Sequence, residues 1–174
     1  MGIVSPVGSR LEDAWRSVCE GQSGISLVED FDTTALPTRI AGLVKGFSAD
    51  DYLSAKEQRK NDPFVHYGVA ATIDAIRDSG LDITEENGHR IGVAMGSGIG
   101  GIKYIEDNHN KMLAGGPRKV SPFFIPGSII NMTSGQVSIL EHITGPNISI
   151  VTACATSTHC IGLAARSIEH GDAE

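Results

Sequence analysis

The chain has 174 residues, enough to bury one hydrophobic core, and its apolar, charged and glycine contents are typical of an α/β domain. Its formal net charge of −7 argues against nucleic acid as a partner, while leaving room for local basic patches. Three cysteines, an odd number, favour a reducing compartment. No stretch has the pattern of a signal peptide or a membrane span, so we expect a cytoplasmic protein that does not act in a membrane.

The first third of the chain is expected to hold short elements separated by loops. Turn-forming residues are frequent there, and the apolar runs are brief. The expected elements are the end of a strand at residues 3–4, a short helix ending at Gly21 with Leu11, Trp15 and Val18 on one face, a loop over 22–38, a strand over 39–45 and a charged surface helix over 50–61.

The remaining two thirds alternate between helices and strands. Pro63 opens a helix that Gly80 ends, with Val65, Val69, Ile73 and Ile76 on one face. The other expected elements are a strand over 90–95, a glycine-rich turn over 96–101, a polar helix to about residue 113, an irregular segment over 116–126, a helix over 129–142, a buried strand over 147–151 and a helix that ends at Gly171. This alternation predicts an α/β fold with a mainly parallel sheet that helices cover on both faces.

Cys154 lies where the strand over 147–151 is expected to turn into the last helix. A thiol at a helix N-terminus faces unpaired backbone N–H groups and the positive end of the helix dipole, and both favour the nucleophilic thiolate. The arrangement is analogous to the nucleophile elbow of α/β-hydrolases, and the small neighbours Ala153, Ala155 and Ser157 leave room for a thioester. Spacing alone also allows an inert, buried thiol, which is the more frequent state of a free cysteine.

The histidines and cysteines predict no further catalytic pair and no metal site. His159 follows Cys154 by five residues, which turns a helix by about 500°, so the two do not share a face and His159 is not assigned as a base. Cys19, Cys154, His159 and Cys160 lack the paired spacing of a zinc site. We expect neither a metal nor a cofactor.

Gly96, Gly98 and Gly101 match the G-x-G-x-x-G pattern of dinucleotide-binding turns. Two features oppose that interpretation. The acidic residue that binds the ribose about 20 positions further on is missing, and the following helix leads into irregular chain instead of a second parallel strand. The alternative is a turn in which two backbone segments pack closely.

Basic side chains gather at two places in this otherwise acidic chain. Lys56, Arg59 and Lys60 share one face of the expected helix, and Arg118 and Lys119 form a second group. Such groups are usually solvated surface, but they also suit the docking of an acidic partner.

Several stretches together resemble the β-ketoacyl-acyl-carrier-protein synthases, the condensing enzymes of fatty acid synthesis in the thiolase-like superfamily. The run Thr-Ala-Cys-Ala-Thr-Ser-Thr-His-Cys-Ile-Gly around Cys154 resembles their active-site signature, and is closer to the type I than to the type II enzyme. Stretches similar to the type II elongating synthase lie at residues 5–8, 56–60, 90–101 and 116–132. The likeness therefore favours a type II enzyme and leaves its acyl-chain preference open.

The resemblance implies particular roles. Cys154 is implied to accept the acyl chain as a thioester, with its own N–H in the oxyanion hole. Ile99 is implied to gate the acyl pocket, and Phe124 to reach the partner's pocket across a homodimer interface. The residues implied to hold acyl carrier protein are Lys56, Arg59, Lys60, Arg118 and Lys119. In the implied reaction, malonyl-carrier protein decarboxylates and attacks the acyl-cysteine, which gives a 3-oxoacyl chain longer by two carbons.

The resemblance also implies that residues 1–174 are the N-terminal αβα half of a five-layer αβαβα fold. The family's first strand and its C-terminal half, which carries two histidines, a lysine and a Gly-rich loop, are then absent from this stretch. We therefore expect this part alone to condense nothing, and its last helix to expose an apolar face. The alternatives are a non-catalytic fragment that docks carrier protein and a dinucleotide-binding domain.

Overall fold

The computed structural model describes all residues from 1 to 174, and they divide into two compact units. The smaller unit combines residues 1–49 with 70–80, and the larger unit combines residues 50–69 with 81–174. Every residue to which the sequence assigns a functional role lies in the larger unit. None of the helices combines the length and the apolar composition that crossing a membrane requires.

The smaller unit holds the helix α1 (Leu11–Cys19) and an antiparallel pair of short strands, β1 (Ile25–Leu27) and β2 (Ile40–Gly42). The helix and β2 confirm two predicted elements, but β1 lies inside the segment 22–38, which was expected to be a loop. The expected strand end at residues 3–4 is also wrong, because the backbone there forms only a bridge between Ser5 and Gly8.

The helix predicted from Pro63 is α3 (Pro63–Ser79). Its predicted face is confirmed: Val65 and Val69 are fully buried, Ile73 is buried, and Ile76 is half-buried. Gly80 follows the helix with a φ of 67°, in the left-handed region where a side chain would be strained. The sequence therefore predicts both ends of this helix correctly.

A parallel pair of strands, β3 (Val93–Gly96) and β4 (Asn147–Ile150), forms the centre of the larger unit, with Val93 opposite Asn147. Two helices, α6 (Met132–Leu140) and α7 (Thr156–Glu169), pack on these strands. The Asn147 side chain donates to Ser134 O of α6 at 3.1 Å. Its neighbour Ile148 instead lines a small cavity with Ala164 of α7.

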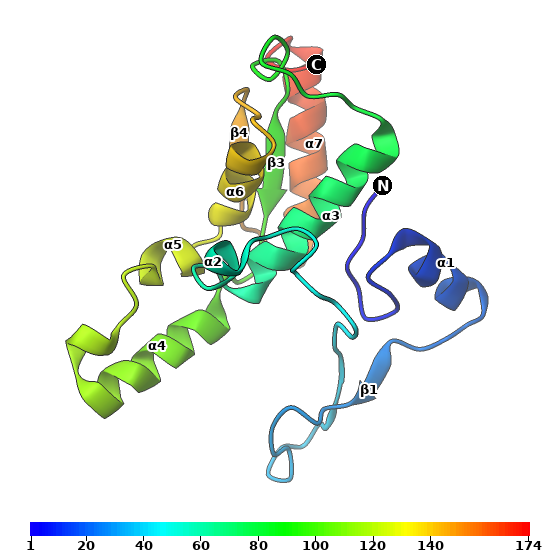
Figure 1. Ribbon diagram of the computed structural model, residues 1–174. Coiled ribbons are helices and arrows are strands. Elements are labelled where there is room, and N and C mark those ends of the chain that lie inside the picture. Colours follow the sequence, from blue (N-terminus) through cyan, green and yellow to red (C-terminus); the bar gives the residue numbers. More distant parts are fainter. The chain divides into compact units, whose positions relative to one another are not determined.

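Because successive strand residues point to opposite faces, α6 and α7 cover opposite faces of the pair (Figure 1). The predicted parallel arrangement with helices on both faces is thus present. The strand β4 is half-buried and not buried as expected, because no other strand of this chain pairs with its outer edge.

The other elements of the larger unit are shorter than predicted or were not predicted. The expected helix over 50–61 is reduced to α2 (Ala55–Gln58), and the expected helix over 129–142 is reduced to α6. The polar helix is present as α4 (Ile102–Gly115). The segment 116–126, expected to be irregular, contains the 3-10 helix η1 (Pro117–Lys119) and the start of α5 (Phe124–Ser128).

Candidate active site

The chain bends sharply between β4 and α7, in a segment that we call the elbow (residues 152–156). It contains the single 3-10 turn η2 (Ala153–Ala155), with Cys154 at its centre. Ala153 has a φ of 50°, a left-handed conformation that is rare for a residue with a Cβ. The predicted bend from strand to helix is therefore present, and the side chain of Cys154 is exposed there, unlike an inert core thiol.

Hydrogen bonds within the elbow leave two backbone N–H groups, those of Ala153 and Cys154, without an acceptor. Thr152 N donates to Thr156 Oγ1 at 2.9 Å, and Thr156 Oγ1 donates to Ala153 O at 2.8 Å. Ala155 N donates to Thr152 O at 3.0 Å, whereas the N–H of Cys154 donates to no acceptor in the chain. A free backbone N–H beside an exposed thiol is able to stabilise negative charge on a bound carbonyl oxygen.

The other candidate groups of α7 are engaged or buried. His159 Nδ1 lies 2.6 Å from Thr152 Oγ1, and no hydrogen bond joins His159 to Cys154. Cys160 is 6% exposed, and burial raises the pKa of its thiol, which keeps it in the protonated form. Cys154 is thus the accessible thiol of this site. Nowhere do three His, Cys, Asp or Glu side chains gather as metal ligands would.

The glycine turn (residues 96–101) packs directly against the elbow. A Cβ built on Gly98 would lie 3.6 Å from Ala153 O, and one on Gly96 would overlap Ile150 O. At its other end, a Cβ on Gly101 would lie 2.8 Å from Ser128 Cα. The glycines thus permit close approach between segments of the chain's own backbone. This supports the alternative interpretation of the G-x-G-x-x-G pattern, a closely packed turn, over a dinucleotide-binding turn. Ile99, in the middle of this turn, is 72% exposed.

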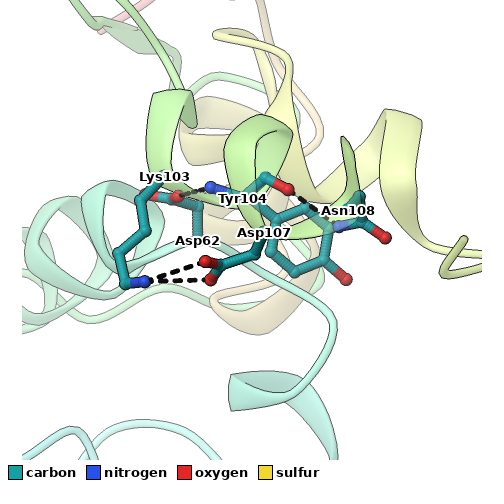
Figure 2. Close-up of polar contacts among 5 residues, drawn as sticks. All are labelled: Asp62, Lys103, Tyr104, Asp107 and Asn108. Carbon is teal, nitrogen blue, oxygen red and sulfur yellow. Dashed lines mark hydrogen bonds and ion pairs between the residues drawn. The ribbon is translucent and has the colours of Figure 1, made fainter. Parts of the chain in front are cut away.

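The Asp62 carboxylate caps the N-terminus of α4, the helix that follows the glycine turn. Its side chain is almost fully buried; Oδ1 accepts from Phe64 N of α3 at 3.1 Å, and Oδ2 accepts from Tyr104 N of α4 at 2.9 Å. Figure 2 shows the second contact. Gly101, the residue before α4, has no side chain to cap the helix. One carboxylate therefore caps two helices and fixes the end of the glycine turn.

Asn108 and Tyr104 of α4 fix the segment that leads to Phe124. The buried Asn108 side chain donates to Tyr104 O and accepts from Ser121 N, both at 2.8 Å, and the first of these bonds is drawn in Figure 2. Tyr104 OH lies 3.0 Å from Ser121 Oγ. Phe124 then begins α5 and is half-buried. The last residue of α5, Ser128, accepts from Gly101 N at 2.9 Å, so α5 and the glycine turn are joined.

The basic side chains proposed from the sequence form no ion pair in the structure. Lys60 Nζ lies 5.2 Å from the centroid of the Phe123 ring. Lys119 precedes Phe123 by four residues, which limits the separation of their Cα atoms to about 14 Å. The two basic groups therefore lie near each other. We call this set the basic surface: Lys56, Arg59, Lys60, Arg118 and Lys119.

Thr156 and Asn108 were not identified from the sequence. Asp62 was identified only as part of the start of α3 and not as the residue that also caps α4. The Asp62-Pro63 pair was available as a helix-start signal, and it located α3. The contacts of Thr156 and Asn108 lie across a bend and between segments, which no short sequence pattern records.

The model of the beta-ketoacyl synthase N-terminal domain family matches residues 1–174, and the chain belongs to this family. It is similar to the 3-oxoacyl-[acyl-carrier-protein] synthase 2 of Vibrio cholerae, with 55% identity over the whole chain and 42% of that protein. The corresponding enzyme of Vibrio harveyi is 56% identical over the same shares, and that of Coxiella burnetii is 51% identical. The chain thus spans less than half the length of these relatives.

Solved structures agree with this assignment. A beta-ketoacyl synthase from Burkholderia phymatum superposes with a TM-score of 0.85 at 27% identity, over 99% of this chain and 43% of that chain. A type II PKS ketosynthase, solved in complex with its acyl-carrier protein, superposes with a TM-score of 0.82 at 25% identity, over 99% of this chain and 47% of that chain. The predicted family and the predicted thiolase-like α/β fold are confirmed.

Proposed function

We propose that the full-length protein carrying this chain is a 3-oxoacyl-[acyl-carrier-protein] synthase of fatty acid elongation, most similar to the type II enzyme. The observation that carries this proposal is the exposed thiol of Cys154 at the bend between β4 and α7, beside its own free N–H. Relatives that are 51–56% identical over the whole chain bear that name.

The first step is acyl transfer to Cys154. The thiolate attacks the carbonyl carbon of the carrier-bound thioester, a new C–S bond forms, and the carrier's thiol leaves. The oxygen carries negative charge in between, and the N–H of Cys154 stabilises it. In the second step, malonyl-carrier protein loses carbon dioxide, and the resulting carbanion attacks the acyl-cysteine. This releases the thiolate and a 3-oxoacyl chain longer by two carbons. We assign the decarboxylation to no residue of this chain.

Ile99 and Phe124 are proposed to shape the acyl pocket. Ile99 is exposed on the turn that packs against the elbow, and Phe124 begins the helix joined to the other end of that turn. The role of a gate suits Ile99, because it lies between glycines of the turn that packs closely against the elbow. The proposal includes a homodimer in which Phe124 reaches the pocket of the partner.

The basic surface is proposed to dock acyl carrier protein through the carrier's acidic helix. Its five cations make no ion pair within the chain, so they are free to meet carboxylates of a partner. A related ketosynthase has been solved with its own acyl-carrier protein. The odd cysteine count, with all three thiols free, supports the cytoplasm as the compartment.

The test is the formation of 3-oxoacyl-carrier protein from acyl- and malonyl-carrier protein by the full-length protein, followed by mass spectrometry. We expect product with the unaltered protein and none above background with Cys154→Ala. Cys19→Ser is the matched control and should keep full activity, because this thiol lies on α1 in the smaller unit. Carrier binding without any product in the unaltered protein would favour a docking protein over an enzyme.

A further inference from the structure

We propose that Thr156 is a positioning residue that aims the N–H of Cys154 at the thioester oxygen. This inference rests on the acyl transfer proposed above. Thr156 is 5% exposed, and its hydroxyl bridges the two sides of the elbow: it accepts from Thr152 N at 2.9 Å and donates to Ala153 O at 2.8 Å.

The second of these bonds controls the direction of the Cys154 N–H. The carbonyl of Ala153 and the N–H of Cys154 belong to one peptide group, which is planar and trans, so they point in opposite directions. Ala153 O accepts from the backbone N–H of Thr156 and also from its hydroxyl, and the hydroxyl bond further fixes the line along which the Cys154 N–H points. The sulfur of Cys154 has no part in either bond.

Ala153, the residue that precedes this peptide bond, has a strained backbone conformation. Its φ of 50° lies in the left-handed region, which is unfavourable for a residue with a Cβ. Rotation about the N–Cα bond of Ala153 would relieve that strain, and it would also swing the Ala153–Cys154 peptide and turn the N–H of Cys154 away from the site. The two bonds of the Thr156 hydroxyl oppose such a rotation.

The methyl group of Thr156 fixes which way the hydroxyl points. A Cβ on Gly96 would lie 2.6 Å from Thr156 Cγ2, so the methyl packs on the glycine turn while the hydroxyl faces the elbow. A β-branched side chain is stiff at χ1, and the buried methyl holds the rotamer. Serine retains the hydroxyl without this lock, and valine retains the shape without the hydroxyl.

The experiment compares two reactions of Cys154 in the full-length protein: acyl transfer from acyl-carrier protein, and alkylation by iodoacetamide. Only the first develops charge on an oxygen that the N–H stabilises. For Thr156→Val we expect acyl transfer to fall by about 100-fold, the cost of a misplaced catalytic contact. Alkylation should stay within about twofold, because the thiol and its exposure are unchanged. Thr156→Ser should restore most of the transfer rate.

Three results would overturn the inference: normal acyl transfer in Thr156→Val, an equal loss of transfer and alkylation, or no rescue by serine. If valine prevents folding, the pair Thr156→Ser and Thr156→Ala provides the same comparison, because the two variants differ only in the hydroxyl. Absence of acyl transfer in the unaltered protein would overturn the proposed function together with this inference. Normal transfer in the hydroxyl-free variants would overturn the inference alone.

Discussion

Cys154 and Cys160 lie six residues apart, yet their surroundings give them different chemistry. Cys154 is exposed at the elbow, whereas Cys160 is buried in α7, and burial raises the pKa of its thiol. At pH 7.5 we expect iodoacetamide to modify Cys154 and the exposed Cys19 while Cys160 stays unmodified in the folded protein. Peptide mass spectrometry measures this directly. Modification of Cys160 at the rate of Cys154 would contradict the assigned burial.

His66 makes the stability of the fold depend on pH. Burial lowers the pKa of this imidazole; the hydrogen-bonded Gln58 carbonyl and the charge of Asp62 oppose the shift. As the pH falls through about 6.5, the unfolded chain therefore binds the proton more readily than the folded chain, and the free energy of unfolding decreases. Above that pH His66 is neutral in both the folded and the unfolded chain, so it does not change the free energy of unfolding.

The test of this pH dependence is urea denaturation between pH 7.5 and 5.5. We expect His66→Gln to reduce the loss of stability on acidification, because the variant lacks the imidazole whose pKa burial lowers. An identical pH profile in the variant would show that His66 does not contribute.

At the scale of elements, α3 and α4 depend on a single carboxylate. Asp62→Ala removes the side-chain acceptors of both Phe64 N and Tyr104 N, and one such cap is worth about 1 kcal/mol. We expect the free energy of unfolding to fall by about 2 kcal/mol, measured by urea denaturation.

The control for this prediction lies one turn further along α4 (Figure 2). Asp107 pairs with Lys103 at 2.9 Å, but both side chains are largely exposed, at 44% and 68%. Such a pair contributes little, so Asp107→Asn should change the free energy of unfolding by less than about 0.5 kcal/mol. Equal effects of the two substitutions would contradict the capping role of Asp62.

Strong local patterns predicted some elements well, and tertiary contacts decided the others. The spacing of Val65 and Val69 and the stops at Pro63 and Gly80 are enough to locate α3. The strand β1 was missed because it has three residues and its partner β2 begins 13 positions later. The five residues of α5 include a proline and a glycine, so no propensity favours a helix there.

In the candidate site, too, local sequence patterns located some residues, whereas the roles of others depend on tertiary contacts. The change from a β-branched run to small residues was enough to place Cys154 at the bend. The second cap made by Asp62 joins it to Tyr104, 42 residues away, and the role of Thr156 depends on a backbone carbonyl across the bend. Neither contact has a local sequence signature. The roles of Ile99, Phe124 and the basic surface came from family resemblance and stay predictions.

At the scale of the whole molecule, α7 has the exposed apolar face that the sequence predicts. Ile161 is 71% exposed, and Ile168, seven residues further along the same face, is 56% exposed. An apolar surface of this kind marks a region of a protein that is suited to contact with another surface. The chain spans less than half the length of the relatives named above.

If the basic surface binds acyl carrier protein, reversing the charge of its residues should weaken that binding. Each of Arg59→Glu and Arg118→Glu should weaken binding of acyl carrier protein by severalfold, and the loss should be greatest at low salt. Isothermal titration calorimetry measures the affinity. Lys45→Glu makes the same change of charge in the smaller unit and should leave the affinity unchanged. Equal affinities of all these proteins would contradict docking at the basic surface.

The central claim is that Cys154 is the thiol that receives the acyl chain, and the most direct measurement locates the acyl group itself. The full-length protein is incubated with acyl-carrier protein, digested, and mapped by peptide mass spectrometry. We predict that the acyl mass appears on the peptide containing Cys154 and disappears in Cys154→Ala. An acyl group found on Cys19 or Cys160, or one that persists in the Cys154→Ala protein, would contradict the account.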